Sequence, residues 1–116
     1  MQLLISDANI LIDIEVGELL IPMFALDYQF VVPDVLFYEE LEEHHAHLLD
    51  IGLKIKSFDE HMVIQVSELA KRHVRPSRND LFALLLAQIE KCPLLTGDKH
   101  LKIAAENEKI EVRGTL

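Results

Sequence analysis

The sequence predicts an α/β protein: a three-layer α/β/α sandwich built on a central parallel sheet of four to five strands. Short apolar runs alternate with helical segments along all 116 residues, and no repeat, low-complexity tract or linker separates them. Such alternation is typical of a parallel sheet with helices on both faces. Half of the residues are hydrophobic and only four are Gly and four Pro, which indicates one globular domain, 1–116, with a single core.

The first half of the chain predicts two strands and three helical segments. Gly17 stops the first helix, and Pro33-Asp34 ends the second strand and caps the helix after it. In chain order we expect a strand at 3–5, a helix from about 8 to 16, a short helical piece at about 19–26, a strand at 30–32, and a helix from 34 to about 49.

The second half predicts three more strands and three more helices. Residues 53–58 alternate with a period of two, which favours an edge strand with one solvated face. Ser77-Arg78-Asn79-Asp80 has the form of a capping box before an apolar run. We expect a strand at 53–58, a helix at 59–73 with Val63, Val66, Leu69 and Ala70 on its apolar stripe, a helix from 80 to about 91, a strand at 94–96, a helix from 98 to about 107, and a strand at 110–112.

Composition also indicates the cellular setting. Cys92 is the only cysteine, and the chain shows no signal peptide, so we expect a reducing, cytoplasmic environment. Apolar stretches such as Leu81–Ala87 are too short to cross a bilayer, so we expect no membrane association.

The net charge of −9 argues against nonspecific binding of nucleic acid through overall electrostatics. One segment differs, because residues 71–78 hold four of the eleven basic residues just before Asp80. Basic side chains are ordinary at a helix end. The segment therefore fits either a solvated helix end or a contact with nucleic acid.

Four carboxylates stand where the predicted fold gathers side chains. Asp7 and Asp98 directly follow apolar runs, Asp80 opens a helix, and Glu40 lies on the helix after the second strand. Residues after the carboxyl ends of parallel strands meet at one edge of the sheet, and like charges there raise one another's pKa. A divalent cation such as Mg²⁺ or Mn²⁺, which prefers oxygen ligands, relieves that repulsion. The sequence therefore predicts a metal-dependent acidic site.

Each acid also has a purely structural interpretation. Asp is a favoured helix cap, so all three aspartates fit capping roles. Glu40 belongs to a charge run that fits a solvated helix face. Glu39 and Glu40 both border the apolar stripe of their helix, so periodicity does not choose between them.

Taken together, the motifs resemble those of the PIN domain family of metal-dependent ribonucleases, over nearly the whole chain. The matching segments are Ser6–Ile12 for the opening strand-to-helix motif, Val31-Val32-Pro33 followed by Tyr38-Glu39-Glu40-Leu41 for the second, Asn79-Asp80 before Leu81–Ala87 for the third, and Leu94-Leu95-Thr96-Gly97-Asp98 for the fourth and most specific. In the family's second motif the acid immediately before Leu is the ligand, which favours Glu40. The chain departs from many relatives by ending soon after the fifth expected strand.

The resemblance implies hydrolysis of RNA phosphodiesters by a water activated on Mg²⁺ or Mn²⁺. We expect Asp7 and Asp98 to hold the principal cation, and Asp80 and Glu40 to position the water or a second ion. The candidates for supporting these carboxylates are Ser6, Asn9 and Thr96, whose alternative role is hydrogen bonding at strand and helix ends. The candidates for RNA contact are Arg72, Arg75 and Arg78.

The resemblance also implies partners. Many compact PIN proteins are the toxin of a toxin–antitoxin pair, and many form dimers, so we expect an antitoxin protein and a homodimer. The helices near 19–26 and 59–73 are the expected two-fold interface.

Other functions remain open. A haloacid-dehalogenase-type phosphatase needs a second Asp two residues after its nucleophile, and that position holds Asn9. A receiver-like phosphoacceptor needs a paired acid after the first strand, where Asp7 stands alone. A binding module that keeps the PIN fold without turnover is the non-enzymatic alternative.

Several other polar residues have two interpretations. His44, His45 and His47 fit a solvated helix better than a Zn²⁺ site, because no second ligand group follows at a recognisable spacing. Lys99 and His100, beside Asp98, either contact phosphate or are simply exposed near a helix start.

Overall fold

The computed structural model describes residues 2–16, 28–50 and 52–114. Within them, five parallel strands form one sheet in the order β3-β2-β1-β4-β5. The strands are β1 (Gln2–Ser6), β2 (Tyr28–Pro33), β3 (Lys54–Lys56), β4 (Leu94–Leu95) and β5 (Val112–Arg113). The predicted α/β class with an all-parallel sheet is confirmed.

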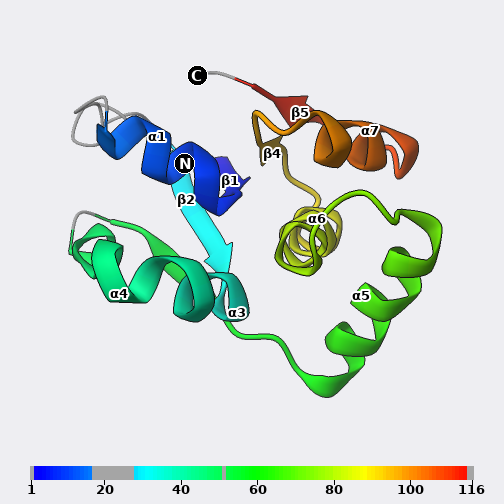
Figure 1. The fold of residues 1–116 in the computed structure, drawn as a ribbon, viewed down its shortest axis with the longest axis horizontal. Coiled ribbons are helices and arrows are strands. Elements are labelled where there is room, and N and C mark those ends of the chain that lie inside the picture. The colour runs from blue at the N-terminus through cyan, green and yellow to red at the C-terminus, as the bar shows by residue number, and fades with distance from the viewer. Residues whose placement is uncertain (1, 17–27, 51, 115–116) are drawn as a thin grey trace.

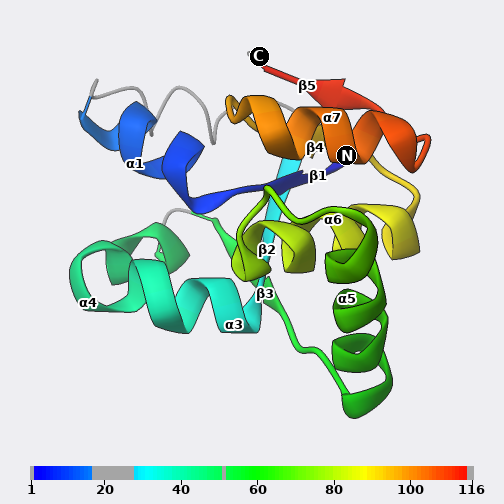
Figure 2. The same ribbon diagram turned by 45° about the vertical axis from the view of Figure 1, so that its right-hand side comes forward.

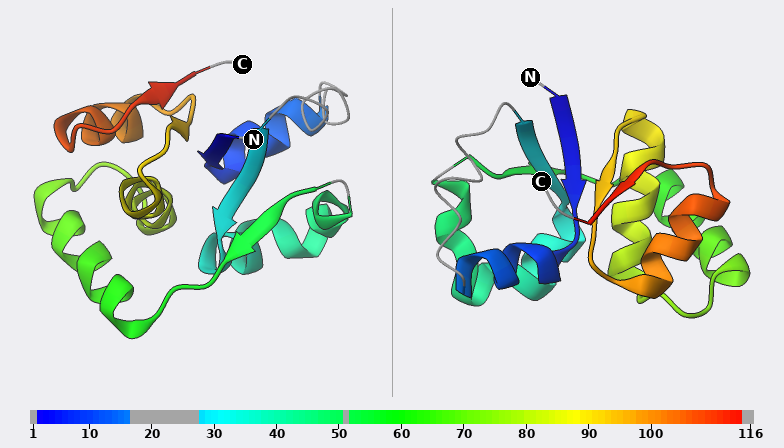
Figure 3. Two further views of the ribbon diagram at one scale, coloured as in Figure 1. Left: turned by 180° about the vertical axis from the view of Figure 1, so that it is seen from behind. Right: turned by 90° about the horizontal axis from the view of Figure 1, so that it is seen from above.

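Helices cover both faces of this sheet (Figure 1 and Figure 3). The segments α1, α3 and α4 lie on one side, and α5, α6 and α7 lie on the other. Their bounds are α1 (Ala8–Val16), α3 (Asp34–Leu36), the π-helical turn η1 (Phe37–Leu41), α4 (Glu42–His45), the 3-10 turn η2 (Ala46–Leu49), α5 (Glu60–Arg72), α6 (Arg78–Glu90) and α7 (Lys99–Asn107).

The core is centred on α6. Residues 81–87 of this helix are all buried, as expected for an apolar run without a polar face. On α5, Val66 and Leu69 are buried and Val63 is half-buried, whereas Ala70 is exposed and does not belong to the apolar stripe.

The third strand lies at the edge of the sheet, as its alternating pattern predicts, but it is shorter than expected. Only Lys54–Lys56 pairs with β2, and its two lysines are exposed. Beyond it, the backbone N–H of Phe58 donates to the Asp34 carboxylate over 3.3 Å, so the chain turns away from the sheet.

The fifth strand begins two residues later than predicted. The backbone N–H of Ile110 donates to the carbonyl of Ala105 at the end of α7, over 2.9 Å. Ile110 therefore completes the helix end, and pairing with β4 starts at Val112.

The predicted helix at 34–49 is not regular. It begins as α3, widens into η1 at Phe37–Leu41, and ends as the 3-10 turn η2. A π-helical turn inserts an extra residue into a helix and often accompanies a functional site. Glu40 lies within this turn.

The structure bears only in part on the expected dimer interface and on membrane association. The helical piece expected at 19–26 lies outside the described residues. Among the helices described, none has the length and hydrophobicity needed to cross a bilayer.

The strand order places a topological switch point between β1 and β4. From β1 the chain moves to β2 and β3 on one side, and α5 and α6 then carry it back to β4 on the other side. The two neighbouring strands therefore connect in opposite directions at their carboxyl ends. In open parallel sheets, this topological switch point is where ligands bind.

Candidate functional site

Asp7 and Asp98 lie at this switch point, one after β1 and the other after β4. The hydroxyl of Thr96 connects them: Oγ1 donates to Oδ2 of Asp7 and accepts from the backbone N–H of Asp98 over 3.0 Å. Asp7 is 1% exposed and Thr96 2%, so this contact is held inside the protein.

Both aspartates also cap helices, as their structural interpretation predicts. Oδ1 of Asp7 accepts from the N–H of Ile10, and Oδ1 of Asp98 accepts from the N–H of Leu101, each over 2.9 Å. These bonds satisfy donors at the starts of α1 and α7 and hold the carboxylates at the sheet edge. Capping uses one oxygen of each carboxylate, and the second oxygen of Asp7 accepts from Thr96, so neutral donors orient these groups and leave their negative charge in place.

Asp80 does not open its helix as predicted, because the helix starts two residues earlier. Helix α6 begins at Arg78, and its cap is Ser77, whose hydroxyl accepts from the N–H of Asp80 over 3.1 Å. Hydrogen bonding with the side chain and backbone of Ser77 also lowers the pKa of Asp80, as expected for the reciprocal bond of a capping box. The capping box is therefore formed, with Asp80 inside the first turn rather than at the cap.

Glu40 reaches the same edge from the opposite helical layer. Asn79 donates from Nδ2 to Oε2 of Glu40 over 3.1 Å, which joins η1 to the start of α6. Glu39 has no such contact among the described residues, so the structure brings Glu40 rather than Glu39 to the other acids. Sequence reasoning missed the role of Asn79. Its only signal was its position directly before Asp80.

The four acids share one electrostatic environment. Burial raises the pKa of Asp7, and the charges of Asp80 and Asp98 raise it further. Burial is also the main cause of the raised pKa of Asp80, with the Asp98 charge adding to it. The pKa of Glu40 is raised by burial and by the charge of Asp80. Hydrogen bonds to each of the three carboxylates lower the pKa and only partly offset these effects.

The oxygen donors of this site are of the kind that a divalent cation prefers, but they do not form a complete coordination sphere. A pocket of about 290 Å³ is lined by Asp7, Asn9, Ile10, Gly97 and Asp98. Carboxylate oxygens are the preferred ligands of Mg²⁺ and Mn²⁺. However, no three His, Cys, Asp or Glu side chains in the described ranges are grouped closely enough to hold a metal as they stand. The donor set fits such an ion, and its carboxylates would have to draw together around it.

The other predicted supporting residues have smaller roles. The hydroxyl of Ser6 donates to the backbone carbonyl of Asp7 over 2.8 Å, which is hydrogen bonding at a strand end. Asn9 is exposed and lines the pocket, and no hydrogen bond links it to Asp7 in the described part of the chain. Thr96 is the only one of these three candidates that contacts an acidic side chain among the residues described.

The three candidate arginines are dispersed. Arg72 forms an ion pair with Glu108, with 3.3 Å between Nε and Oε2. Arg78 lies over the ring of Phe82, 5.0 Å from its centroid. Arg75 lines a different pocket together with Lys99 and His100. The structure thus separates Arg78 from the other two.

The histidines after Glu40 do not form a metal group with any other side chain described. His44 is exposed, with its Nε2 3.7 Å from Oε1 of Glu43, which agrees with a solvated helix. Cys92 is a half-buried free thiol whose pKa is raised by burial, so it is poorly reactive.

Comparison with known proteins finds similarity in structure but not in sequence. No protein-family model matches the chain, and no curated protein matches it at the level of sequence. Among solved structures, VapBC-1 from nontypeable Haemophilus influenzae is similar with a TM-score of 0.66 and 14% identity, over 97% of each chain. VapBC2 from Rickettsia felis, solved bound to a promoter DNA fragment, gives 0.64 and 17% identity, over 97% of this chain and 98% of that one.

A third similar structure is a PilT N-terminus domain protein from the archaeon Sulfolobus solfataricus. Its TM-score is 0.64 at 12% identity, over 97% of this chain and 86% of that one. The domain that these structures share is the PIN domain. The parallel five-stranded sheet, the helical layers on both faces and these likenesses together assign the chain to the PIN-like fold, as its motifs predict.

Proposed function

We propose that this protein is a Mg²⁺- or Mn²⁺-dependent endoribonuclease. The observation that carries the proposal is that Asp7, Glu40, Asp80 and Asp98 come from separate elements to the switch point, where burial and neighbouring acidic charges raise the pKa of Asp7, Glu40 and Asp80. Keeping several partly buried carboxylates together costs stability unless a cation neutralises them. Carboxylates that served only to cap helices would have no reason to lie within range of one another's charge.

The roles of the residues follow from their contacts. Asp7 and Asp98 would hold the principal cation, with Thr96 fixing the direction of Asp7. Asp80 and Glu40 would hold the attacking water or a second ion, with Asn79 positioning Glu40. When bound, the ion lowers the pKa of its water and neutralises charge on phosphoryl oxygens. Asp7 is 1% exposed, so little bulk water would reach the cation from its side.

We further propose that the protein works as the toxin of a toxin–antitoxin pair in the cytoplasm. The similar solved structures include VapBC and FitAB complexes of a PIN toxin component with its antitoxin. An antitoxin Arg or Lys would form charge-assisted bonds with the four carboxylates and replace the cation. Homodimerisation is proposed on the same likeness, with exposed Ile64 on α5 as part of the contact.

One observation favours a second candidate. Because no metal-ligand group is preformed in the described residues, a binding module with the PIN fold and no turnover also fits the structure.

Cleavage of single-stranded RNA, measured with Mn²⁺, with Mg²⁺ and with EDTA, tests the proposal. We expect EDTA to abolish cleavage, and Asp98→Asn or Glu40→Gln to reduce it by about 10²-fold or more. Glu39→Gln, the neighbouring change, is the control and should retain activity. Full activity of Asp98→Asn contradicts the proposal. A Mn²⁺-dependent rise in melting temperature without cleavage supports the binding module, and hydrolysis of p-nitrophenyl phosphate alone supports the phosphatase.

A further inference from the structure

A basic pocket adjoins the acidic site. It has a volume of about 430 Å³ and lies between the end of α5, the connection from α5 to α6, and the first turns of α7. Figure 2 shows that connection running alongside α7. Arg75, Lys99 and His100 line the pocket, together with the apolar side chains Val74 and Ile103.

The positive charge of this pocket is not neutralised from within the protein. Arg72 and His73, which also line it, are both paired with Glu108. In contrast, the side chains of Arg75, Lys99 and His100 form no ion pair or hydrogen bond with any residue that the structure describes. In a chain with a net charge of −9, uncompensated basic side chains facing one cavity point to an anionic ligand.

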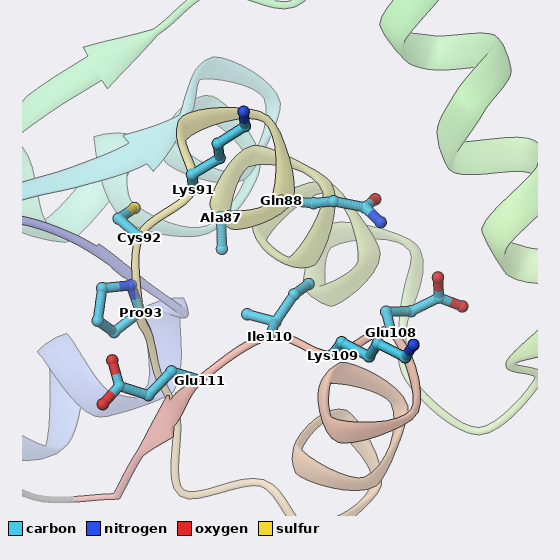
Figure 4. A pocket seen from close by; sticks show the side chains of 9 residues that line it. All are labelled: Ala87, Gln88, Lys91, Cys92, Pro93, Glu108, Lys109, Ile110 and Glu111. Carbon is cyan, nitrogen blue, oxygen red and sulfur yellow. The ribbon is translucent and has the colours of Figure 1, made fainter.

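A second pocket also contains basic side chains, but they are not alone there. A pocket of about 350 Å³ lies at the opposite edge of the sheet (Figure 4). Its lysines, Lys91 and Lys109, are accompanied by Glu108 and Glu111, and the side chain of Ile110 points toward α6. Acidic side chains line this pocket together with its lysines, so unlike the basic pocket it does not present cations alone.

The basic pocket is also in the right place for a substrate. Asp98 lines the acidic pocket, and Lys99, the next residue in the chain, lines the basic one. A nucleic-acid strand with one phosphate at Asp98 would therefore continue into the basic pocket.

The apolar residues indicate the form of that strand. Val74 is 81% exposed and Ile103 is 46% exposed, which leaves apolar surface beside the cations. A duplex presents phosphates and stacked bases, whereas a single strand offers unstacked bases that pack on such surfaces.

We propose that this pocket binds single-stranded RNA, taking a backbone phosphate on Arg75 and Lys99 and an unstacked base on Val74 and Ile103. The inference rests on the proposed function, because it extends the RNA path from the acidic site. It also revises the expected arginine set: Arg75 acts with Lys99 rather than with Arg78.

Binding of a short fluorescent single-stranded RNA, measured by anisotropy in EDTA over a series of salt concentrations, tests this pocket without turnover. Arg75→Gln and Lys99→Gln should each weaken binding several-fold and flatten the slope of log affinity against log salt by about 0.7 per lost phosphate contact. Val74→Ser should weaken binding without changing that slope. Lys102→Gln is the matched control, because Lys102 is exposed on the same helix and lines neither pocket.

The outcomes separate this inference from the proposed function. Equal affinities and salt slopes for the parent, Arg75→Gln and Lys99→Gln overturn the pocket, even if the protein cleaves RNA. Tighter binding of a duplex of the same sequence overturns the preference for single strands. Binding that depends on Arg75 and Lys99 without any cleavage supports the pocket and refutes the nuclease.

Discussion

At the scale of single residues, Thr96 and Asn79 determine how the acids are presented. The Thr96 hydroxyl bonds Asp7 with its hydrogen and the Asp98 backbone with its oxygen. Asn79 holds Glu40 from the first turn of α6. Neither side chain is charged, so each orients a carboxylate without neutralising it. The negative charge therefore remains available to a cation.

Asp98 allows its capping role to be separated from its charge. Asn accepts the same bond from Leu101 but carries no charge, so Asp98→Asn should leave the metal-free protein at least as stable as the parent. Asp98→Ala loses the cap and should cost about 1 kcal/mol. Thermal denaturation in EDTA checks both. With Mn²⁺ the melting temperature of the parent should rise and that of Asp98→Asn should not. Equal loss of stability in both variants would mean that the charge of Asp98 stabilises the metal-free fold and is not repelled by the other acids.

At the scale of elements, helices α5 and α7 of one layer are joined at their C-terminal ends. Oε2 of Glu108, just after α7, lies 2.7 Å from Nε2 of His73, just after α5, and Arg72 contacts the same carboxylate. The bond to His73 is the main cause of the lowered pKa of Glu108. This contact holds α5 against α7 and leaves Arg75, three residues further on, facing the basic pocket.

Glu108→Gln should lower the free energy of unfolding by about 1–2 kcal/mol at neutral pH. The pKa of Glu108 is lower in the folded chain than its ordinary 4.5, so this stability is present above pH 4.5 and is lost as the pH falls through the lowered pKa. Urea denaturation over that range measures the difference from the parent. Glu68→Gln, which removes an exposed pair with Lys71, is the control and should change little. A difference that persists unchanged in acid would contradict the assignment.

At the scale of the whole molecule, the acidic site is where all three layers meet. Asp7 and Asp98 come from the sheet, Glu40 from one helical layer and Asp80 from the other. Bringing them together raises the pKa of Asp7, Asp80 and Glu40 through burial and repulsion. The fold therefore carries an electrostatic cost at its switch point.

This cost should be visible in the pH dependence of stability. Because the folded pKa of Asp80 lies above its ordinary 3.8, the ionised carboxylate destabilises the fold at neutral pH, and stability recovers as the pH falls through the raised pKa. Asp80→Asn should therefore melt above the parent at neutral pH in EDTA, and the gap should close toward pH 3.8. The exposed Glu106→Gln is the control. A gap that does not depend on pH would show that the pKa of Asp80 is not raised in the folded protein.

Local sequence determined most of the fold. Apolar periodicity and capping residues located every described strand and helix, and α1 has the predicted bounds of Ala8–Val16. The edge position of β3 also followed from its alternation. The ends of β3 and β5 did not, because Phe58 and Ile110 are held by hydrogen bonds to Asp34 and to the end of α7.

The candidate site divides in the same way. The sequence determined which acids stand at strand and helix ends, because that depends on neighbours along the chain. The family motif favoured Glu40, but only the tertiary structure decided that Glu40 accepts from Asn79, that Arg72 pairs with Glu108, and that Arg75 and Lys99 line the same pocket. Each of these arrangements brings together residues far apart in the sequence. Their formation depends on how whole layers pack, which no local pattern records.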